Sequence, residues 1–227
     1  MSWELKNGVY VRDGCYLEPK TPDQVAADSY ALVGRLLRDK LPAYTNQPPL
    51  LLPLGRGGFK VFLYVSGELR TALESDIDYV PIKVNRYKKG EIGQEDEIQS
   101  DEQDVEQALK ALKNYEECVV IDDIGDRFIT IQHIASQLSG SGKRITVITP
   151  YVKPESNETD IKLENIYYVR PFWRRNIEDK AYLPWVVFPW EKDDFSKVPE
   201  LWELLFPEMV RMQRRAEAEM EEPVSRT

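Results

Sequence analysis

The chain has 227 residues, 42% of them hydrophobic and 30% charged, a composition typical of a globular protein with one core or one core and an extra lobe. Its 39 acidic and 30 basic residues give a net charge of −9, which disfavours nucleic-acid binding, because that binding depends on phosphate neutralisation by Lys and Arg. The two cysteines, Cys15 and Cys118, are too few for a disulfide framework and favour a reducing compartment.

The N-terminal segment predicts a small hairpin and lacks the pattern of a signal peptide. Residues 1–6 have no apolar core, and no stretch of the sequence approaches the ~18 apolar residues that a membrane span needs. We therefore expect a cytoplasmic protein without a membrane partner. Residues 7–18 alternate around Gly8 and Asp13-Gly14, which is typical of a hairpin.

A helix is predicted next. Thr21-Pro22-Asp23 is a helix start signal, because proline is favoured at the first helical position. The apolar residues that follow are spaced four, three and four apart and form one stripe: Ala26, Tyr30, Val33 and Leu37. We expect this helix to end at Pro42, since proline interrupts the helical hydrogen bonds.

A strand over residues 50–54 then leads into the glycine-rich turn Gly55-Arg56-Gly57-Gly58, and a second helix is expected to begin just after it. Residues 78–84 alternate as in a further strand. From about 87 to 104 the sequence is almost entirely polar and strongly acidic, which predicts a loop. Two interpretations stay open for it: the lid of an active site, or a tolerated surface insertion.

The middle of the chain alternates strands and helices. A helix over 105–115, a strand over 118–121, a helix from about 131 to 138 and a strand over 144–149 follow one another. This succession predicts an α/β fold, a mostly parallel twisted sheet flanked by helices. From residue 166 onward the sequence is rich in Tyr, Trp and Pro, and a last helix is expected from 199 to about 220.

One stretch carries chemistry, residues 119–130. An apolar strand delivers Asp122 and Asp123 at its carboxyl end, and Asp126 follows just before a helix. Ligands of open α/β sheets bind at this end of the strands, and the start of a helix favours a phosphate. Adjacent carboxylates can accept hydrogen bonds from ribose hydroxyls and position Mg²⁺. The alternative is that both aspartates only cap a helix or form a turn.

This stretch resembles the phosphoribosyl-diphosphate signature of the type I phosphoribosyltransferases, which has four apolar residues, two acidic ones and then Asp-Thr-Gly-x-Thr. The resemblance implies that Asp122 and Asp123 contact the ribose hydroxyls and hold Mg²⁺. It also implies that Asp126 lies near the purine N7 as a catalytic base. The residues that would bind the 5′-phosphate are Asp126, Arg127, Phe128, Ile129 and Thr130.

Arg127-Phe128 departs from the family pattern, which has Thr-Gly at these two positions. A bulky residue replaces a glycine that lets the backbone approach a phosphate closely. Two interpretations remain open: Arg127 adds a charge-assisted contact to the phosphate, or the site has lost its original ligand.

A second segment also resembles the family. Leu54-Gly55-Arg56-Gly57-Gly58-Phe59 is similar to its diphosphate loop, in which an Arg-Gly-Gly turn precedes a helix. The resemblance implies that Arg56, Gly57 and Gly58 bind the diphosphate. The polar segment 87–104 stands where the family has its lid, and Tyr87 matches the lid tyrosine.

Two further matches indicate the 6-oxopurine (xanthine–guanine or hypoxanthine) branch of the family. In that branch a Lys-Pro pair supplies the ammonium for the 6-oxo group, and Lys153 precedes Pro154 here. A Trp-x-x-x-Pro-Trp-acid segment hoods the base there, and this implies base contacts for Trp185 and Val186. Taken singly, Lys153 also fits a solvated surface lysine, and the tryptophans fit core or oligomer contacts.

The resemblance implies three parts in the chain. Residues 1–23 are an N-terminal extension with the hairpin, residues 24–192 are the phosphoribosyltransferase-like domain, and residues 193–227 are a C-terminal helix and tail. Within the domain the lid covers about 87–104 and a small hood covers about 165–192. His133 is expected to be solvated, and one His with two distant Cys gives no zinc spacing.

The implied activity is that of a glycosyltransferase (pentosyltransferase) with Mg²⁺ as cofactor. It transfers phosphoribose from phosphoribosyl diphosphate to guanine, xanthine or hypoxanthine and releases diphosphate, and the family usually associates as dimers or tetramers. Two alternatives stay open. One is a non-catalytic homologue that binds a nucleotide or phosphoribosyl diphosphate as a sensor or scaffold, and the other is an enzyme that accepts a different base.

Overall fold

The computed structural model describes residues 3–87, 97–125, 128–153, 165–191 and 199–221. The chain forms two compact units: Asp23–Arg174 is one, and Met1–Pro22 together with Arg175–Thr227 is the other. The hood expected over 165–192 therefore does not form a single segment of one unit, because the boundary at Arg174 divides it.

The larger unit is built on a parallel sheet. Its strand order is β11 (Ile166–Tyr167), β9 (Arg144–Ile148), β7 (Glu117–Ile121) and β4 (Leu50–Pro53), and every neighbouring pair is parallel. This confirms the mostly parallel sheet that the sequence predicts.

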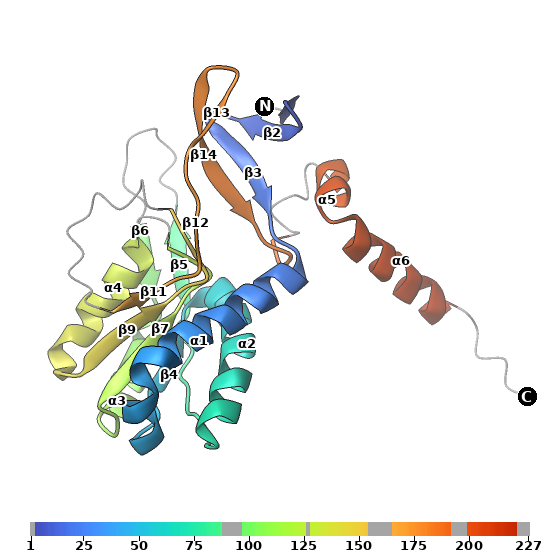
Figure 1. The fold of residues 1–227 in the computed structure, drawn as a ribbon. Helices are drawn as coiled ribbons and strands as arrows, with labels where there is room; N and C mark the ends of the chain where they lie inside the picture. Colours follow the sequence, from blue (N-terminus) through green and yellow to red (C-terminus); the bar gives the residue numbers. More distant parts are fainter. Residues whose placement is uncertain (1–2, 88–96, 126–127, 154–164, 192–198, 222–227) are drawn as a thin grey trace, which may run out of the picture. The chain divides into compact units, whose positions relative to one another are not determined.

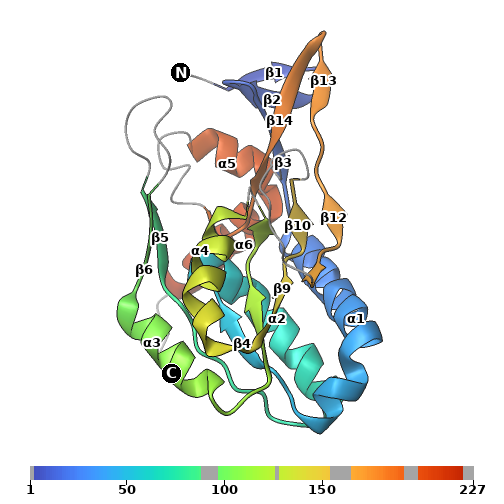
Figure 2. The ribbon, with the colours of Figure 1, turned by 90° about the vertical axis from the view of Figure 1, so that its left-hand side faces the viewer.

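Helices cover both faces of this sheet (Figures 1 and 2). Alternate residues of β4 and β7 point to opposite faces: Leu51 and Val119 pack with α1 (Pro22–Asn46) and α2 (Gly55–Leu73). Leu52 and Val120 pack with α3 (Glu102–Leu112) and α4 (Ile129–Leu138). Because both faces are covered, all residues of the two strands are buried, as is usual in parallel sheets.

Shorter strands extend beyond the carboxyl end of this sheet. β8 (Ile124–Gly125), β10 (Tyr151–Val152) and β12 (Arg170–Pro171) pair in parallel in the order β12-β10-β8. β5 (Val84–Tyr87) and β6 (Glu97–Ser100) form an antiparallel pair. The prediction of a loop over 87–104 is therefore wrong for its last part, where β6 and the start of α3 lie, while residues 88–96 are outside the described residues.

Helix α1 does not end at Pro42, as the sequence predicts, but continues to Asn46. The buried Tyr44 explains this, because its hydroxyl donates a 2.8 Å hydrogen bond to Oε1 of Glu117 at the start of β7. This contact holds the last turn in place although Pro42 lacks an N–H group. None of the described helices is both long and apolar enough to span a membrane.

The smaller unit contains a five-stranded sheet in the order β1 (Glu4–Lys6), β2 (Val9–Arg12), β3 (Cys15–Pro19), β14 (Lys180–Val187) and β13 (Arg175–Ile177). The expected hairpin is thus a three-stranded meander. Its turns, Asn7-Gly8 and Asp13-Gly14, have positive φ at both residues, as two-residue hairpin turns of type I′ require.

The C-terminal helix expected from 199 to 220 is two helices, α5 (Pro199–Leu205) and α6 (Pro207–Glu221). The break falls at Phe206, just before Pro207, whose ring prevents the helical hydrogen bond that would continue α5. Phe206 packs on Trp202 with 4.4 Å between ring centroids, which fixes the chain at the break.

Candidate functional site

A cavity of about 230 Å³ lies at the carboxyl ends of β4 and β7. Arg56 and Gly57 line it from the first turn of α2, Asp122 and Asp123 from the residues after β7, and Thr130 from the first turn of α4. Three segments that are separate in sequence, and that the sequence predicts to form one site, therefore share one cavity.

Helix α2 presents its uncapped N-terminus to this cavity. The N-cap residue, Leu54, has no capping hydrogen bond from its side chain, so the helix start and the positive end of its dipole favour an anion. Gly55 has a φ of 53° and donates its N–H to the carbonyl of Ile82 at 2.9 Å. The positively charged Arg56 follows at the edge of the cavity.

Gly58, expected as a ligand contact, has a different role. It is buried and does not line the cavity, and a Cβ there would lie 2.3 Å from the carbonyl oxygen of Ile121. The glycine therefore lets α2 pack directly against the end of β7, which holds the helix start beside the two aspartates.

Both aspartates line the cavity and are half-buried. Asp122 Oδ1 accepts a 2.9 Å hydrogen bond from the N–H of Asp123, so Asp122 also serves the turn, as the alternative interpretation has it. Burial raises the pKa of Asp122 well above its usual range, and the charge of Asp123 raises it further. A cation or a hydrogen-bond donor in the cavity relieves this unfavourable arrangement.

The start of α4 differs from the expected phosphate cradle. Asp126 and Arg127 lie outside the described residues. Phe128 is the N-cap of α4 and adopts the left-handed conformation, with a φ of 53°. Its ring is buried in the core beside Gly125, where an added Cβ would lie 2.6 Å from the ring. Phe128 therefore keeps a backbone conformation that favours glycine, and it does not line the cavity.

Ile129 begins α4, and among the described residues of the expected phosphate cradle, Thr130 lines the cavity. The N-cap Phe128 has no capping hydrogen bond from its side chain, so the start of α4, like that of α2, favours an anion.

The residues expected to bind the base are divided between the two units. Lys153 follows β10 in the larger unit, and its N–H donates a 3.2 Å hydrogen bond to the carbonyl of Gly125. Trp185 and Val186 belong to β14 in the smaller unit. There Trp185 contacts Trp3 edge to face, with 6.0 Å between ring centroids, and Val186 is buried.

Val84, the first residue of β5, lines the cavity although the sequence analysis does not include it. It is the last residue of the predicted strand 78–84, and this place at the end of a strand is the sequence signal that could have indicated a cavity residue. Tyr87, the expected lid residue, is the last residue of β5, whose backbone pairs with Glu97.

The carboxylates fit a Mg²⁺ ion that is only partly held by protein. Asp122 and Asp123 supply the oxygen ligands that Mg²⁺ prefers, and this ion is commonly bound by one or two carboxylates together with substrate phosphates and water. Among the described residues no group of three or more His, Cys, Asp or Glu could hold a metal.

Comparison with known proteins identifies similar folds. No protein-family model matches the chain, and no curated protein matches it. A hypothetical protein from Neisseria gonorrhoeae, crystallised with bound ppGpp, is similar with a TM-score of 0.57 and 16% sequence identity. The match covers 84% of this chain and 99% of that one. The two chains share a fold.

Purine phosphoribosyltransferases are also among the similar structures. The enzyme from Pyrococcus horikoshii Ot3 matches with a TM-score of 0.47 and 19% identity over 77% of this chain and 93% of its own. The xanthine-guanine-hypoxanthine enzyme of Helicobacter pylori matches with a TM-score of 0.48 and 14% identity over 78% and 95%.

Proposed function

We propose that this chain is a purine phosphoribosyltransferase that transfers phosphoribose from phosphoribosyl diphosphate to a 6-oxopurine. One observation carries the proposal: Asp122 and Asp123 share a cavity with the uncapped start of α2 at Arg56-Gly57 and with Thr130 at the start of α4. Carboxylates suit ribose hydroxyls, and the two helix starts suit phosphates on either side of the ribose.

In this proposal the chain binds and orients the donor. The diphosphate lies at the start of α2 beside Arg56, and the 5′-phosphate lies at the start of α4 beside Thr130. Asp122 and Asp123 would hold Mg²⁺, which would supply positive charge for the diphosphate. The bond from C1 of the ribose to the diphosphate breaks, the bond from C1 to N9 of the base forms, and Asp126 accepts the proton of the base.

The choice of a 6-oxopurine rests on the sequence resemblance at Lys153, Trp185 and Val186. The ammonium of Lys153 suits the 6-oxo group as acceptor, whereas adenine presents a donor amine there. The cytoplasm as location and a dimer or tetramer as assembly belong to the same proposal. Light scattering measures the assembly directly.

A binding protein without turnover is the second candidate. The buried, left-handed Phe128 favours it, because an ordinary phosphate cradle has glycine at this position. The Neisseria protein with bound ppGpp has a similar fold, which makes ppGpp a suitable ligand to test.

Calorimetry with phosphoribosyl diphosphate and Mg²⁺, run beside a conversion assay on guanine, xanthine and hypoxanthine, tests both candidates. We expect saturable binding and formation of a nucleoside monophosphate, with both lost in Asp123→Asn. Binding of the donor or of ppGpp without conversion of any base supports the second candidate. If neither ligand binds, both candidates are wrong. If the donor binds without conversion of a base, the double variant Arg127→Thr with Phe128→Gly, which restores the family pattern, should be assayed for gained turnover.

A further inference from the structure

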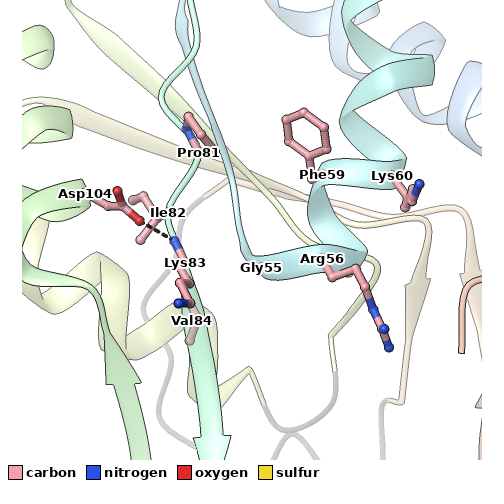
Figure 3. Close-up of a pocket in the computed structure, with 9 residues that line it drawn as sticks. All are labelled: Gly55, Arg56, Phe59, Lys60, Pro81, Ile82, Lys83, Val84 and Asp104. Atoms are coloured by element: carbon pink, nitrogen blue, oxygen red, sulfur yellow. Dashed lines mark hydrogen bonds between the residues drawn. The ribbon is translucent and has the colours of Figure 1, made fainter. Parts of the chain in front are cut away.

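A second and larger cavity adjoins the candidate catalytic cavity (Figure 3). Its volume is about 470 Å³, and it lies between the first two turns of α2 and the segment 81–84 that leads into β5. It shares Gly55, Arg56 and Val84 with the first cavity, but neither aspartate of that cavity lines it. We call this second cavity the α2 groove.

Two rings form the apolar sides of the α2 groove. Phe59 projects from α2, and Pro81 lies across from it, as Figure 3 shows. The Phe59 ring packs on Phe62 with 5.4 Å between centroids, and on Tyr79 with 6.4 Å, so neighbouring rings support it. Ile82, which is buried, adds apolar surface. A flat ring inserted here can stack on Phe59.

Asp104 supplies the acceptor of the α2 groove. One carboxylate oxygen, Oδ2, accepts a 2.8 Å hydrogen bond from the N–H of Lys83, which fixes the position of the carboxylate (Figure 3). A carboxylate has about four acceptor sites on its two oxygens, so Asp104 retains capacity for a ligand donor. An amino group on a heterocycle is such a donor.

Positive charge surrounds this acceptor. Lys60, Lys83 and Arg56 all line the α2 groove and are exposed. Within the described part of the chain the ammonium groups of Lys60 and Lys83 form no ion pair. Two lysines against one carboxylate favour a ligand that carries negative charge. A cavity of this size lies in the range of small-molecule sites, about 300–1,000 Å³.

We propose that the α2 groove binds a nucleoside monophosphate whose base carries an amino group. The base stacks on Phe59, its amino group donates to Asp104, and its phosphate pairs with Lys83 and Lys60. Because Arg56 borders both cavities, a bound mononucleotide changes the affinity of the first cavity for its own anion. This coupling, unlike the binding itself, rests on the proposed function.

The test is made in an Asp123→Asn background, which disables the candidate catalytic cavity and so removes binding of a nucleotide product there. Adenosine monophosphate, purine riboside monophosphate without the amino group, and inorganic phosphate are titrated by calorimetry. We expect adenosine monophosphate to bind, and Lys83→Ala to weaken it by about tenfold or more, as the loss of a charged contact does. Phe59→Leu should also weaken it, whereas Lys110→Ala, an exposed lysine of α3, should not.

Asp104→Asn separates recognition from folding, because the amide oxygen can still accept the Lys83 N–H. This substitution should weaken the binding of adenosine monophosphate and leave the binding of purine riboside monophosphate unchanged. The proposal is wrong if adenosine monophosphate does not bind in this background, or if Lys83→Ala and Phe59→Leu leave its affinity unchanged. It is also wrong if inorganic phosphate binds as tightly as adenosine monophosphate. A failed transferase assay does not alter these outcomes, since no turnover is measured.

Discussion

The carboxylate of Asp123 lies directly against the Cα of Gly57. A Cβ built on Gly57 would stand 1.9 Å from Oδ2 of Asp123, well inside any real contact distance. Gly57 belongs to the first turn of α2, and Asp123 follows β7. Asp123 and the first turn of α2, to which the sequence resemblance assigns the diphosphate, are therefore in direct contact, and the position of one depends on the other.

Replacement of Gly57 by Ala should therefore impair binding more than folding. The methyl group must displace a side-chain carboxylate, which can rotate away, so the binding geometry is lost at small structural cost. We expect affinity for phosphoribosyl diphosphate to fall by about tenfold or more. Gly58→Ala should instead cost folding stability, about 1–3 kcal/mol, because its Cβ meets the backbone oxygen of Ile121.

Gly67 provides the matched control in the same helix. A Cβ at Gly67 has no atom within 4 Å, so Gly67→Ala should stabilise the protein by about 0.5–1 kcal/mol through helix propensity alone. Urea unfolding and calorimetry of the three variants test this order. Unchanged binding in Gly57→Ala, or equal losses of stability at Gly58 and Gly67, would contradict it.

The candidate site could be predicted from sequence where each part is local. Strand 118–121 is apolar and ends in Asp122-Asp123, and the Arg-Gly-Gly turn stands between a strand and a helix. The resemblance implies that the two motifs bind one donor molecule, and the carboxyl ends of parallel strands do meet at one edge of a sheet. In the structure both motifs line one cavity.

What the sequence could not predict depends on contacts between distant segments. The α2 groove requires segment 81–84 to lie beside α2, and this depends on backbone hydrogen bonds of 2.9–3.0 Å between residues 78–82 and residues 51–55, which are far apart in the sequence. The same holds for the burial of the Phe128 ring, which lies in one core cluster with residues of β4, α3 and β7. Local patterns also suggested a helix end at Pro42, but Tyr44 and Glu117 hold one more turn.

Pro42 should accordingly lower the stability of α1. It is exposed and lies inside the helix, where it removes one backbone hydrogen bond. Pro42→Ala should raise the free energy of unfolding by about 1–3 kcal/mol. Pro22→Ala, at the favoured first position of the same helix, should give no gain. Thermal unfolding of both variants decides; a loss of stability in Pro42→Ala would refute the expectation.

Gly125 and Phe128 should behave as a coupled pair. Phe128→Gly loses a buried ring but relieves the left-handed backbone, for a net cost of about 2–3 kcal/mol. Gly125→Ala alone costs about 1–3 kcal/mol, since its methyl group meets the ring.

With the ring gone, the methyl group at position 125 has space. The double variant should thus lose less unfolding free energy than the two single variants lose together, by about 1 kcal/mol or more. Urea unfolding of the four proteins measures the coupling. Strict additivity would show that the ring does not depend on the glycine.

Glu117 should set the acid stability of the larger unit. It is buried at the start of β7, and its carboxylate accepts hydrogen bonds from Tyr44 at 2.8 Å and Thr146 at 2.6 Å. Lys40 and Arg144 add ion pairs at 3.1 and 3.2 Å. Burial alone would raise the pKa of Glu117, but these four contacts outweigh it and lower the pKa.

A lowered pKa in the folded state means that the carboxylate stabilises the fold above the unfolded pKa of about 4.3. This contribution is lost as the pH falls through the folded pKa. Glu117→Gln should therefore cost about 1–3 kcal/mol at pH 7, and the difference from the unmodified protein should shrink below about pH 4. The neighbouring Glu116, which is exposed and paired with Lys143 at 3.6 Å, gives the control, since Glu116→Gln should change little at either pH. Urea unfolding at pH 7 and pH 3 measures both variants. If Glu117→Gln loses as much unfolding free energy at pH 3 as at pH 7, the charge of Glu117 does not stabilise this end of the sheet.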